Sequence, residues 1–194
     1  MRIKHIERPK GCLRALRLLN EQGEITIREL MKKASLSQSG AYSSLDHLVG
    51  LDLIELSAKH CRPGCSKIYR PTEKGEELLI PLSVFFDSLP LVTRRENIDR
   101  YLVNSYRTLE ILLEAYRRGS VTMTDLVKEA GMCKSTACSG LQALLDLNLV
   151  DMEVRTEFRR TTKEYSLTER GQFLGRVVFL VDEKMDSIMS GEES

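Results

Sequence analysis

The sequence predicts a mainly helical α+β protein with small β-wings, made of two tandem copies of one small domain and a C-terminal helix. A shift of about 96 residues lays the second half of the chain on the first without a gap, and roughly 20 of about 66 aligned positions are then identical. Within each copy, apolar residues at helical spacing give way to two short alternating stretches that are typical of paired strands. Two copies indicate a duplicated domain, because a solenoid needs at least three repeats.

Composition and charge set the broad class. The chain has 194 residues, of which 42% are hydrophobic and 29% charged, as in ordinary globular proteins. No apolar run approaches about 18 residues and the start lacks a signal-peptide core, so we expect a cytoplasmic protein. The net charge of +1 gives a nucleic-acid function no general support, so local charge has to provide it. We expect domains at 1–80 and 97–194, joined by a helical connector at 81–96.

The first copy has the order helix, short extended piece, helix, helix and two strands. Thr26 with Glu29 three residues later predicts a capping box, and Ser35 or Ser37 caps the third helix. We expect helices at 8–20 and 27–34 and a third helix that ends near 49. We expect a short extended piece at 24–26 and strands at 53–58 and 67–70. Pro63-Gly64 between the strands predicts an antiparallel hairpin.

A further helix is expected from Thr72 toward Leu89, interrupted at Pro81. The segment 82–89 is too apolar for a loose linker and is interpreted as a packed connector. It could line a pocket between domains, although simple packing is the commoner role of such residues. A capping box at 93–96 then predicts a long helix ending near Arg118.

The second copy repeats this order and ends in a helix with an apolar stripe. We expect a short strand at 121, helices at 124–130 and 134–145, and strands at 150–155 and 163–167. The stripe after Thr168 comprises Leu174, Val177, Val178, Val181, Met185 and Ile188. Its spacing, close to a heptad, favours a homodimer through the C-terminal helix or, equally, packing on the long helices of the same chain.

Individual sequence motifs, as well as the order of the predicted elements, resemble those of a known family. SLSQSGAYSSLDHLVGLDLIEL, which starts at Ser35, resembles the recognition helix and following strand of MarR-like and ArsR-like regulators of bacteria and archaea. The motifs YRPTEKG and YSLTERG resemble the motif that ends the wing in those families. The resemblance covers 13–78 and 109–174 and implies two tandem winged helix-turn-helix domains that bind double-stranded DNA.

The third helix of each copy is the expected reader of bases. A helix with one apolar face and one face of small polar residues can enter the major groove. Gln38 and Gln142 are the best base readers, because an amide can pair with adenine through two bonds. The serines could instead only cap their helices. The candidates are Ser37, Gln38, Ser39, Tyr42, Ser43 and His47 in the first copy, and Lys134, Ser135, Thr136, Ser139 and Gln142 in the second.

The two hairpins concentrate positive charge that the overall balance hides. Neutralising phosphates is the part of DNA affinity that does not depend on sequence. The acidic residues Asp46, Glu153 and Glu157 oppose this interpretation, and an ordinary solvated hairpin is the alternative. The candidates are Lys59, His60, Arg62, Lys67 and Arg70 in the first hairpin, and Arg155, Arg159, Arg160 and Lys163 in the second.

The five cysteines of a cytoplasmic chain are expected to be reduced thiols. Cys61 and Cys65 flank the Arg-Pro-Gly turn and would lie opposite each other, so a disulfide at the wing tip is an alternative to two plain thiols. Neither this pair nor Cys133 with Cys138 has the spacing of a zinc site, so we expect no metal, although some ArsR-like proteins sense metals through cysteines. We expect no cofactor either, and the motifs of phosphate loops, hydrolases and zinc proteases are absent from the sequence.

The sequence therefore predicts a DNA-binding transcriptional regulator and not an enzyme. Two recognition helices could dock about 34 to 36 Å apart, in successive major grooves, on an imperfect repeat. The alternative is a protein-interaction scaffold, because tandem winged helices also resemble the chromosome-condensation partner ScpB and endosomal sorting subunits. A replication initiator shares the fold, and nothing in the sequence separates it from a regulator.

Overall fold

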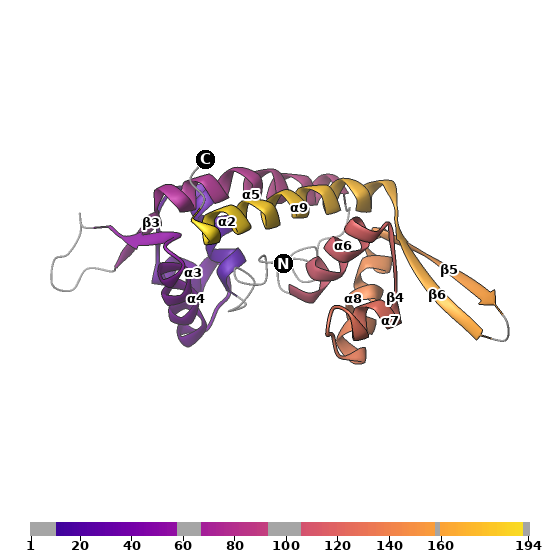
Figure 1. Ribbon diagram of the computed structural model, residues 1–194. Helices are drawn as coiled ribbons and strands as arrows, with labels where there is room; N and C mark the ends of the chain where they lie inside the picture. The colour runs from indigo at the N-terminus through magenta and orange to yellow at the C-terminus, as the bar shows by residue number, and fades with distance from the viewer. Residues whose placement is uncertain (1–10, 58–66, 93–105, 158–159, 192–194) are drawn as a thin grey trace. The chain divides into compact units, whose positions relative to one another are not determined.

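The computed structural model describes residues 11–57, 67–92, 106–157 and 160–191, and it is mainly helical with two small antiparallel sheets (Figure 1). The chain divides into two compact units. The first comprises 1–86 and 181–194, and the second comprises 87–180. The domain boundaries at 80/81 and 96/97 stay predictions.

The first unit begins with three helices around a short strand. These are α2 (Cys12–Gln22), β1 (Ile25–Thr26), α3 (Ile27–Lys33) and α4 (Gln38–Gly50), followed by β2 (Ile54–Leu56), β3 (Ile68–Pro71) and α5 (Glu73–Val92). The strands form one sheet in the order β1-β3-β2, with Tyr69 paired to both Ile25 and Leu56. Buried leucines from α2, α3 and α4 make the core under this sheet, and burying them is the main favourable term in its folding.

Local signals in the sequence set where these helices start. Thr26 accepts a hydrogen bond from the Glu29 backbone N–H, and the Glu29 carboxylate accepts one from the Thr26 N–H at 2.8 Å. These bonds satisfy donors that the first turn of a helix leaves unpaired, and they lower the pKa of Glu29. Ser37, rather than Ser35, caps α4 by accepting from Gly40 N–H at 3.2 Å. The capping box and one of the two alternative serine caps are therefore confirmed.

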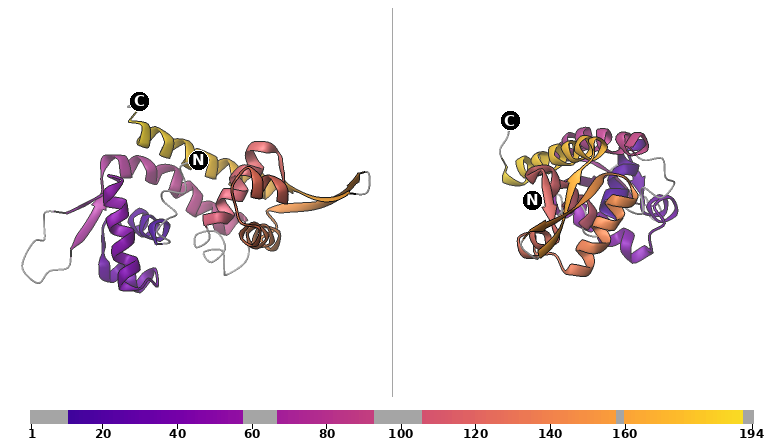
Figure 2. Two further views of the ribbon diagram at one scale, coloured as in Figure 1. Left: turned by 60° about the horizontal axis from the view of Figure 1, so that its bottom comes forward. Right: turned by 90° about the vertical axis from the view of Figure 1, so that its right-hand side faces the viewer.

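The second unit has the same order of elements. It contains α6 (Tyr106–Arg118), β4 (Ser120–Thr122), α7 (Met123–Lys128), α8 (Lys134–Asp146), β5 (Val150–Glu157) and β6 (Arg160–Leu167), and α9 (Glu169–Ser190) begins in it. Its sheet order is β4-β6-β5, with Tyr165 paired to Val121 and Met152. The hairpin of β5 and β6 extends well beyond the helices of its own unit (Figures 1 and 2).

Details of backbone geometry recur at the same shift of about 96 residues. Asp52 and Asn148 both have a φ of 58°, in the left-handed region that Asn and Asp tolerate best. The carbonyls of these two residues accept hydrogen bonds from the hydroxyls of Thr72 and Thr168, at 2.6 and 2.9 Å. The two units therefore share their strand register and also the turn that returns each chain segment to a helix.

Two predicted elements differ from the structure. Pro81 does not interrupt the helix, because α5 runs from Glu73 to Val92. Proline removes one backbone hydrogen bond, but the buried Leu78, Leu82 and Phe85 hold both sides of it on one core. In the second copy the strands reach Glu157 and Arg160, further than the predicted 150–155 and 163–167. The long helix predicted from Thr93 is described only from Tyr106 onward.

The apolar stripe of the C-terminal helix is buried by the chain itself. Leu174, Val177, Val178, Val181 and Met185 are all buried in a single copy. Lys184 forms an ion pair with Glu77 of α5 at 2.5 Å, within the first unit. Burial within one chain already satisfies the hydrophobic driving force of this stripe, and a homodimer through the C-terminal helix stays a prediction. The alternative, packing on helices of the same chain, is the one that the structure has.

Among the described residues, no helix is long and apolar enough to cross a membrane.

Candidate nucleic-acid interface

The helix α4 buries most of its apolar residues on one face and exposes most of its polar residues on the other, with the buried Ser44 and the exposed Val49 as exceptions. Ala41, Leu45 and Leu48 have no exposed surface and pack into the core. Ser39, Gln38, Tyr42 and Ser43 are exposed, so a ligand can reach their polar atoms without rearranging the core. Of the remaining candidates, Ser37 is exposed but accepts the capping bond, and His47 is half-buried. The exposed face of α4 is a row of neutral hydrogen-bonding groups, with the carboxylate of Asp46 beside them.

The equivalent helix α8 has a similar buried face but a more occupied polar face. Lys134, Ser135, Ser139 and Gln142 are exposed and Thr136 is half-buried. The Gln142 amide donates to the Asp146 carboxylate at 3.0 Å, and the Ser139 hydroxyl donates to the Ser135 carbonyl at 3.0 Å. Base contacts by these two side chains would have to replace bonds that already exist, so α4 is better prepared for binding than α8.

A tyrosine of the sheet lies behind each of these helices. Burial raises the pKa of the Tyr69 phenol, and the nearby Asp46 and Tyr42 of α4 raise it further. Burial likewise raises the pKa of Tyr165, with a smaller contribution from Cys138 of α8. Each tyrosine therefore lies close enough to the third helix of its own unit for charges on that helix to act on its phenol.

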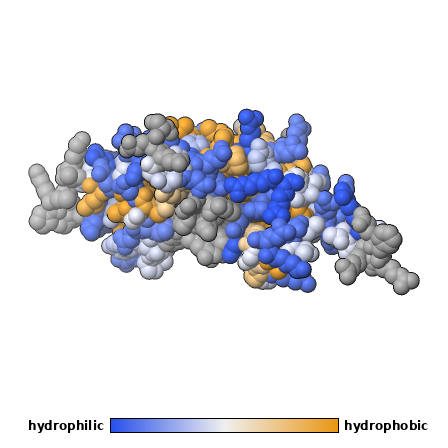
Figure 3. All heavy atoms as spheres, viewed as in Figure 1, coloured by the Kyte–Doolittle hydropathy of each residue, from blue (hydrophilic) through white to orange (hydrophobic). Residues whose placement is uncertain are grey.

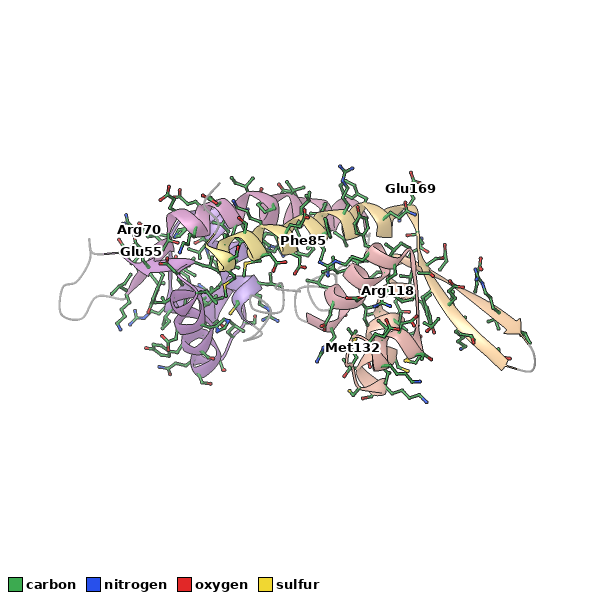
Figure 4. All side chains as sticks on the ribbon, in the orientation of Figure 1. Glu55, Arg70, Phe85, Arg118, Met132 and Glu169 are labelled. Carbon is green, nitrogen blue, oxygen red and sulfur yellow. The ribbon has the colours of Figure 1, made fainter. Side chains whose placement is uncertain are left out.

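The hairpins carry fewer uncompensated cations than their sequences suggest. Arg70 donates to Glu55 across β2 and β3 at 2.7 Å, and Figure 4 shows the two side chains together. Arg155 lies between Glu164 at 2.8 Å and Glu153 at 3.9 Å. Lys67 and Lys163 are exposed and form no ion pair with any described residue. Lys59, His60, Arg62 and Arg159 lie outside the described residues, as does the side chain of Arg160.

The repeat itself marks a set of exposed residues, and one pair of them was not selected from the sequence. Most positions that are identical in the two copies are buried, or cap or turn the backbone, as packing requires. Five identical pairs are instead exposed polar residues for which no capping or turning hydrogen bond is described; one, Glu73 and Glu169, is acidic and starts the helix after the last strand, and four lie earlier in each unit. These four are Lys32 and Lys128, Ser39 and Ser135, Ser43 and Ser139, and Lys67 and Lys163. Lys32 and Lys128 were missed, although comparing exposed positions between the copies would have found them.

These four pairs lie on or beside three elements in each unit: the end of the second helix, the third helix, and the last strand, which Lys67 precedes and which contains Lys163. Contacts within each unit connect these elements, since the second helix packs on the third helix and also contacts the first strand, which pairs with the last strand. Two cations and two hydroxyls on one such surface can neutralise phosphates and donate hydrogen bonds to bases or backbone. We call this set in each unit the retained face.

The cysteines that the structure describes are free thiols in different environments. Cys133 precedes α8 and is exposed, with its sulfur 3.4 Å from the Ser135 hydroxyl and 2.8 Å from the Thr136 hydroxyl. These hydrogen bonds lower the pKa of Cys133 to about 7. Burial raises the pKa of Cys12 to about 12, against a smaller lowering by the Ser44 side chain, and the Cys12 thiol donates a hydrogen bond to the Ser44 carbonyl. The predicted alternative of a Cys61–Cys65 disulfide lies outside the described residues.

Alkylation with iodoacetamide should therefore label Cys133 much faster than Cys12 in the folded protein. The thiolate is the reactive species, so the labelling rate of Cys133 should rise with pH around a midpoint near 7. Cys12 should react only when the protein is unfolded. Peptide mass spectrometry after timed labelling between about pH 5.5 and pH 9 measures both rates. Equal labelling of the two cysteines would contradict these environments.

Among the described residues, no three His, Cys, Asp or Glu side chains gather so that they could hold a metal ion.

Comparison with known proteins gives likenesses to solved structures but none to a protein family or a curated protein. The chain is similar to a MarR transcriptional regulator from Methanosarcina mazei Go1, with 19% identity and a TM-score of 0.42, over 61% of this chain and 84% of that one. The residues and geometry of the chain itself, rather than this likeness, support the function proposed for it.

Proposed function

We propose that the chain is a sequence-specific DNA-binding transcriptional regulator with two winged-helix domains in tandem. The retained face in each unit is the observation that supports this most. Exposed polar residues drift after a duplication unless a shared function keeps them, whereas buried ones are kept by packing. A helix with lysines at its edges and hydroxyls and amides along it suits the major groove.

The two units would make different contacts with DNA. In the first, the free amide of Gln38 and the hydroxyl of Ser43 would read base edges. In the second, Lys134 would contact a phosphate, because the best base reader of α8 is already bonded to Asp146. The proposed operator is therefore an imperfect repeat, with one half-site specified more strongly than the other. A cytoplasmic location accompanies this proposal.

Selection from random duplex DNA tests the proposal. The full-length protein is incubated with a random pool at low salt, bound duplexes are amplified, and the affinity of the selected sequence is measured over a range of salt. We expect an enriched site with two unequal halves and an affinity that falls steeply with salt. Equal binding to selected and random duplexes would contradict sequence-specific reading.

The hairpin cations offer a sharper prediction about charge. Lys163→Ala should reduce the magnitude of the salt slope of DNA binding by about 1, because an uncompensated cation that contacts a phosphate is lost. Arg155→Ala should leave the slope unchanged, since Glu164 and Glu153 already compensate that guanidinium. Fluorescence anisotropy titrations of both variants measure the slopes. An equal loss for the two variants would show that Arg155 exchanges its carboxylate partners for phosphate.

A protein-interaction scaffold is the second candidate, and the compensated charge of the hairpins favours it. Arg70 and Arg155 both pair with carboxylates, which lowers the positive field that steers a protein to DNA. A scaffold would bind neither selected nor random duplex at low salt. A replication initiator would bind DNA through the same residues, so it is not separated from a regulator by these observations.

A further inference from the structure

The exposed face of α4 carries one carboxylate among its neutral polar groups. Asp46 is exposed and lies one helical turn after Tyr42 and Ser43, so it continues the row of polar groups along this helix. Burial raises the pKa of the Tyr69 phenol, and the nearby Asp46 raises it further. In the part of Figure 3 that α3 and α4 occupy, hydrophilic and neutral colours predominate along the lower edge of the first unit. The carboxylate is therefore part of the surface that α4 would present to DNA.

Three other acidic residues, which lie before and after α4 in the sequence, each have a partner or a structural role. Glu29 completes the capping box at the start of α3. Asp52 and Glu55 form ion pairs with basic side chains, at 3.1 and 2.6 Å. Asp46 forms no ion pair with any residue in the described part of the chain, and aspartate has a low helix propensity. The described contacts of the first unit therefore give this carboxylate no part in stability.

The repeat shows that the same position differs between the two third helices. Gln142 of α8 is the residue that matches Asp46, and its amide donates to Asp146. The residue of α4 that matches Asp146 is Gly50, so α4 has no second carboxylate one turn further on. An ionised carboxylate can only accept hydrogen bonds, whereas an amide both donates and accepts. The two helices therefore offer different hydrogen-bonding groups at one equivalent place.

A carboxylate on a surface that faces DNA discriminates between bases. Phosphates repel it, which weakens binding to every sequence alike. In the major groove it can accept a hydrogen bond from the amino group at cytosine N4. Adenine also presents an amino group there, but its adjacent N7 is an acceptor, and guanine N7 and O6 and thymine O4 are acceptors as well. A carboxylate in this position therefore favours cytosine and disfavours the other three bases.

We infer that Asp46 is a specificity-determining residue that selects a cytosine in the half-site bound by α4. This role depends on the proposed function, and it assigns a use to a residue whose charge opposes DNA binding in general. The cytosine amino group would donate to the Asp46 carboxylate, while Tyr42 and Ser43 contact neighbouring groups. The carboxylate lowers affinity for all DNA and raises the ratio between the correct site and its competitors.

Replacement by asparagine, which has nearly the same shape, separates base reading from simple repulsion. The wild type and Asp46→Asn are each taken through selection from random duplexes, and every base pair of the wild-type site is then substituted in turn. The wild type should require a cytosine at one position of one half-site, with about a tenfold or larger loss for any other base. Asp46→Asn should exchange that cytosine for adenine, because an asparagine amide pairs with adenine N6 and N7. The other positions should keep their preferences.

A second variant and a matched control complete the comparison. Asp46→Ala should remove the preference at this one position and bind random duplex about twofold more tightly, because one charge that repels the phosphates is lost. Glu76→Gln removes an exposed carboxylate from α5, which is outside the proposed interface, and should change neither the preference nor the affinity. Circular dichroism confirms that the variants are folded, as expected for changes at exposed positions.

Failure of this role is distinguishable from failure of the proposed function. If the wild type selects a site but both Asp46 variants bind all substituted duplexes more tightly by one common factor, Asp46 only repels DNA and does not read it. A selected site without a required cytosine would overturn the role as well. A wild type that enriches no sequence would instead overturn the proposed function, and the role of Asp46 with it.

Discussion

Replacing Gly171 by alanine should lower the free energy of unfolding by about 3 kcal/mol or more. A Cβ at this position would lie 1.9 Å from the carbonyl oxygen of Leu149. That oxygen cannot simply move away, because it accepts a hydrogen bond from the Thr168 N–H at 3.1 Å. Relief of the clash would have to shift the start of α9 from the turn that precedes β5. Chemical denaturation followed by circular dichroism measures the loss.

Gly75 is the matched residue of the first unit, and its Cβ would meet the Leu53 carbonyl oxygen at the same 1.9 Å. We expect Gly75→Ala to destabilise the protein to a similar extent. Gly50 is the control, because a Cβ there meets nothing within 4 Å and the residue does not have a positive φ. Gly50→Ala should be neutral or stabilise the protein by about 0.5 kcal/mol through helix propensity. If Gly171→Ala were as stable as Gly50→Ala, the close approach of helix and turn would not exist in solution.

The double variant Gln38→Ala/Ser43→Ala should lose about 100-fold in affinity for the selected DNA site. A well-placed bidentate contact contributes about 1 to 3 kcal/mol of discrimination, and every 1.4 kcal/mol is about tenfold. Stability should hardly change, because both side chains are exposed. Affinity for random duplex and the salt slope should also hold, since neither residue carries charge. Fluorescence anisotropy with selected and random duplexes provides both comparisons.

The equivalent variant Gln142→Ala/Ser139→Ala is the internal control. Both side chains of α8 already form hydrogen bonds within the helix, so removing them should cost less than about tenfold in affinity. Losses that are equal in the two helices would show that DNA displaces the Gln142–Asp146 bond at little cost. A larger loss in α8 would reverse the proposed division of work between the units.

Local sequence signals predicted most of the elements because their causes are local. The capping box at Thr26 and its counterpart at Thr122 with Asp125 depend on residues three positions apart, and both are present. The end of the first hairpin was likewise readable from the repeated Thr-Glu-x-Gly phrase. The interruption predicted at Pro81 was wrong because burial of Leu78 and Leu82 on the same core outweighs the backbone hydrogen bond that a proline removes from a helix.

The site was less predictable because charge compensation and burial depend on contacts across the fold. Arg155 is neutralised mainly by Glu164, which is its neighbour only once β5 and β6 are in register. The apolar stripe of α9 indicated a partner, but whether that partner was the same chain could not be read from spacing. By contrast, the bond from Gln142 to Asp146 joins residues four apart on a helix, so it could have been anticipated.

Photo-crosslinking of the protein to its selected duplex tests the central claim most directly. Thymines of the selected site are replaced with 5-iodouracil, whose iodine lies in the major groove, and the crosslinked peptides are identified by mass spectrometry. The account predicts crosslinks within α4, with Tyr42 as the nearest aromatic acceptor, and weaker crosslinks within α8. A duplex that is not bound, or crosslinks confined to elements other than α4 and α8, would contradict the proposal that these helices read DNA.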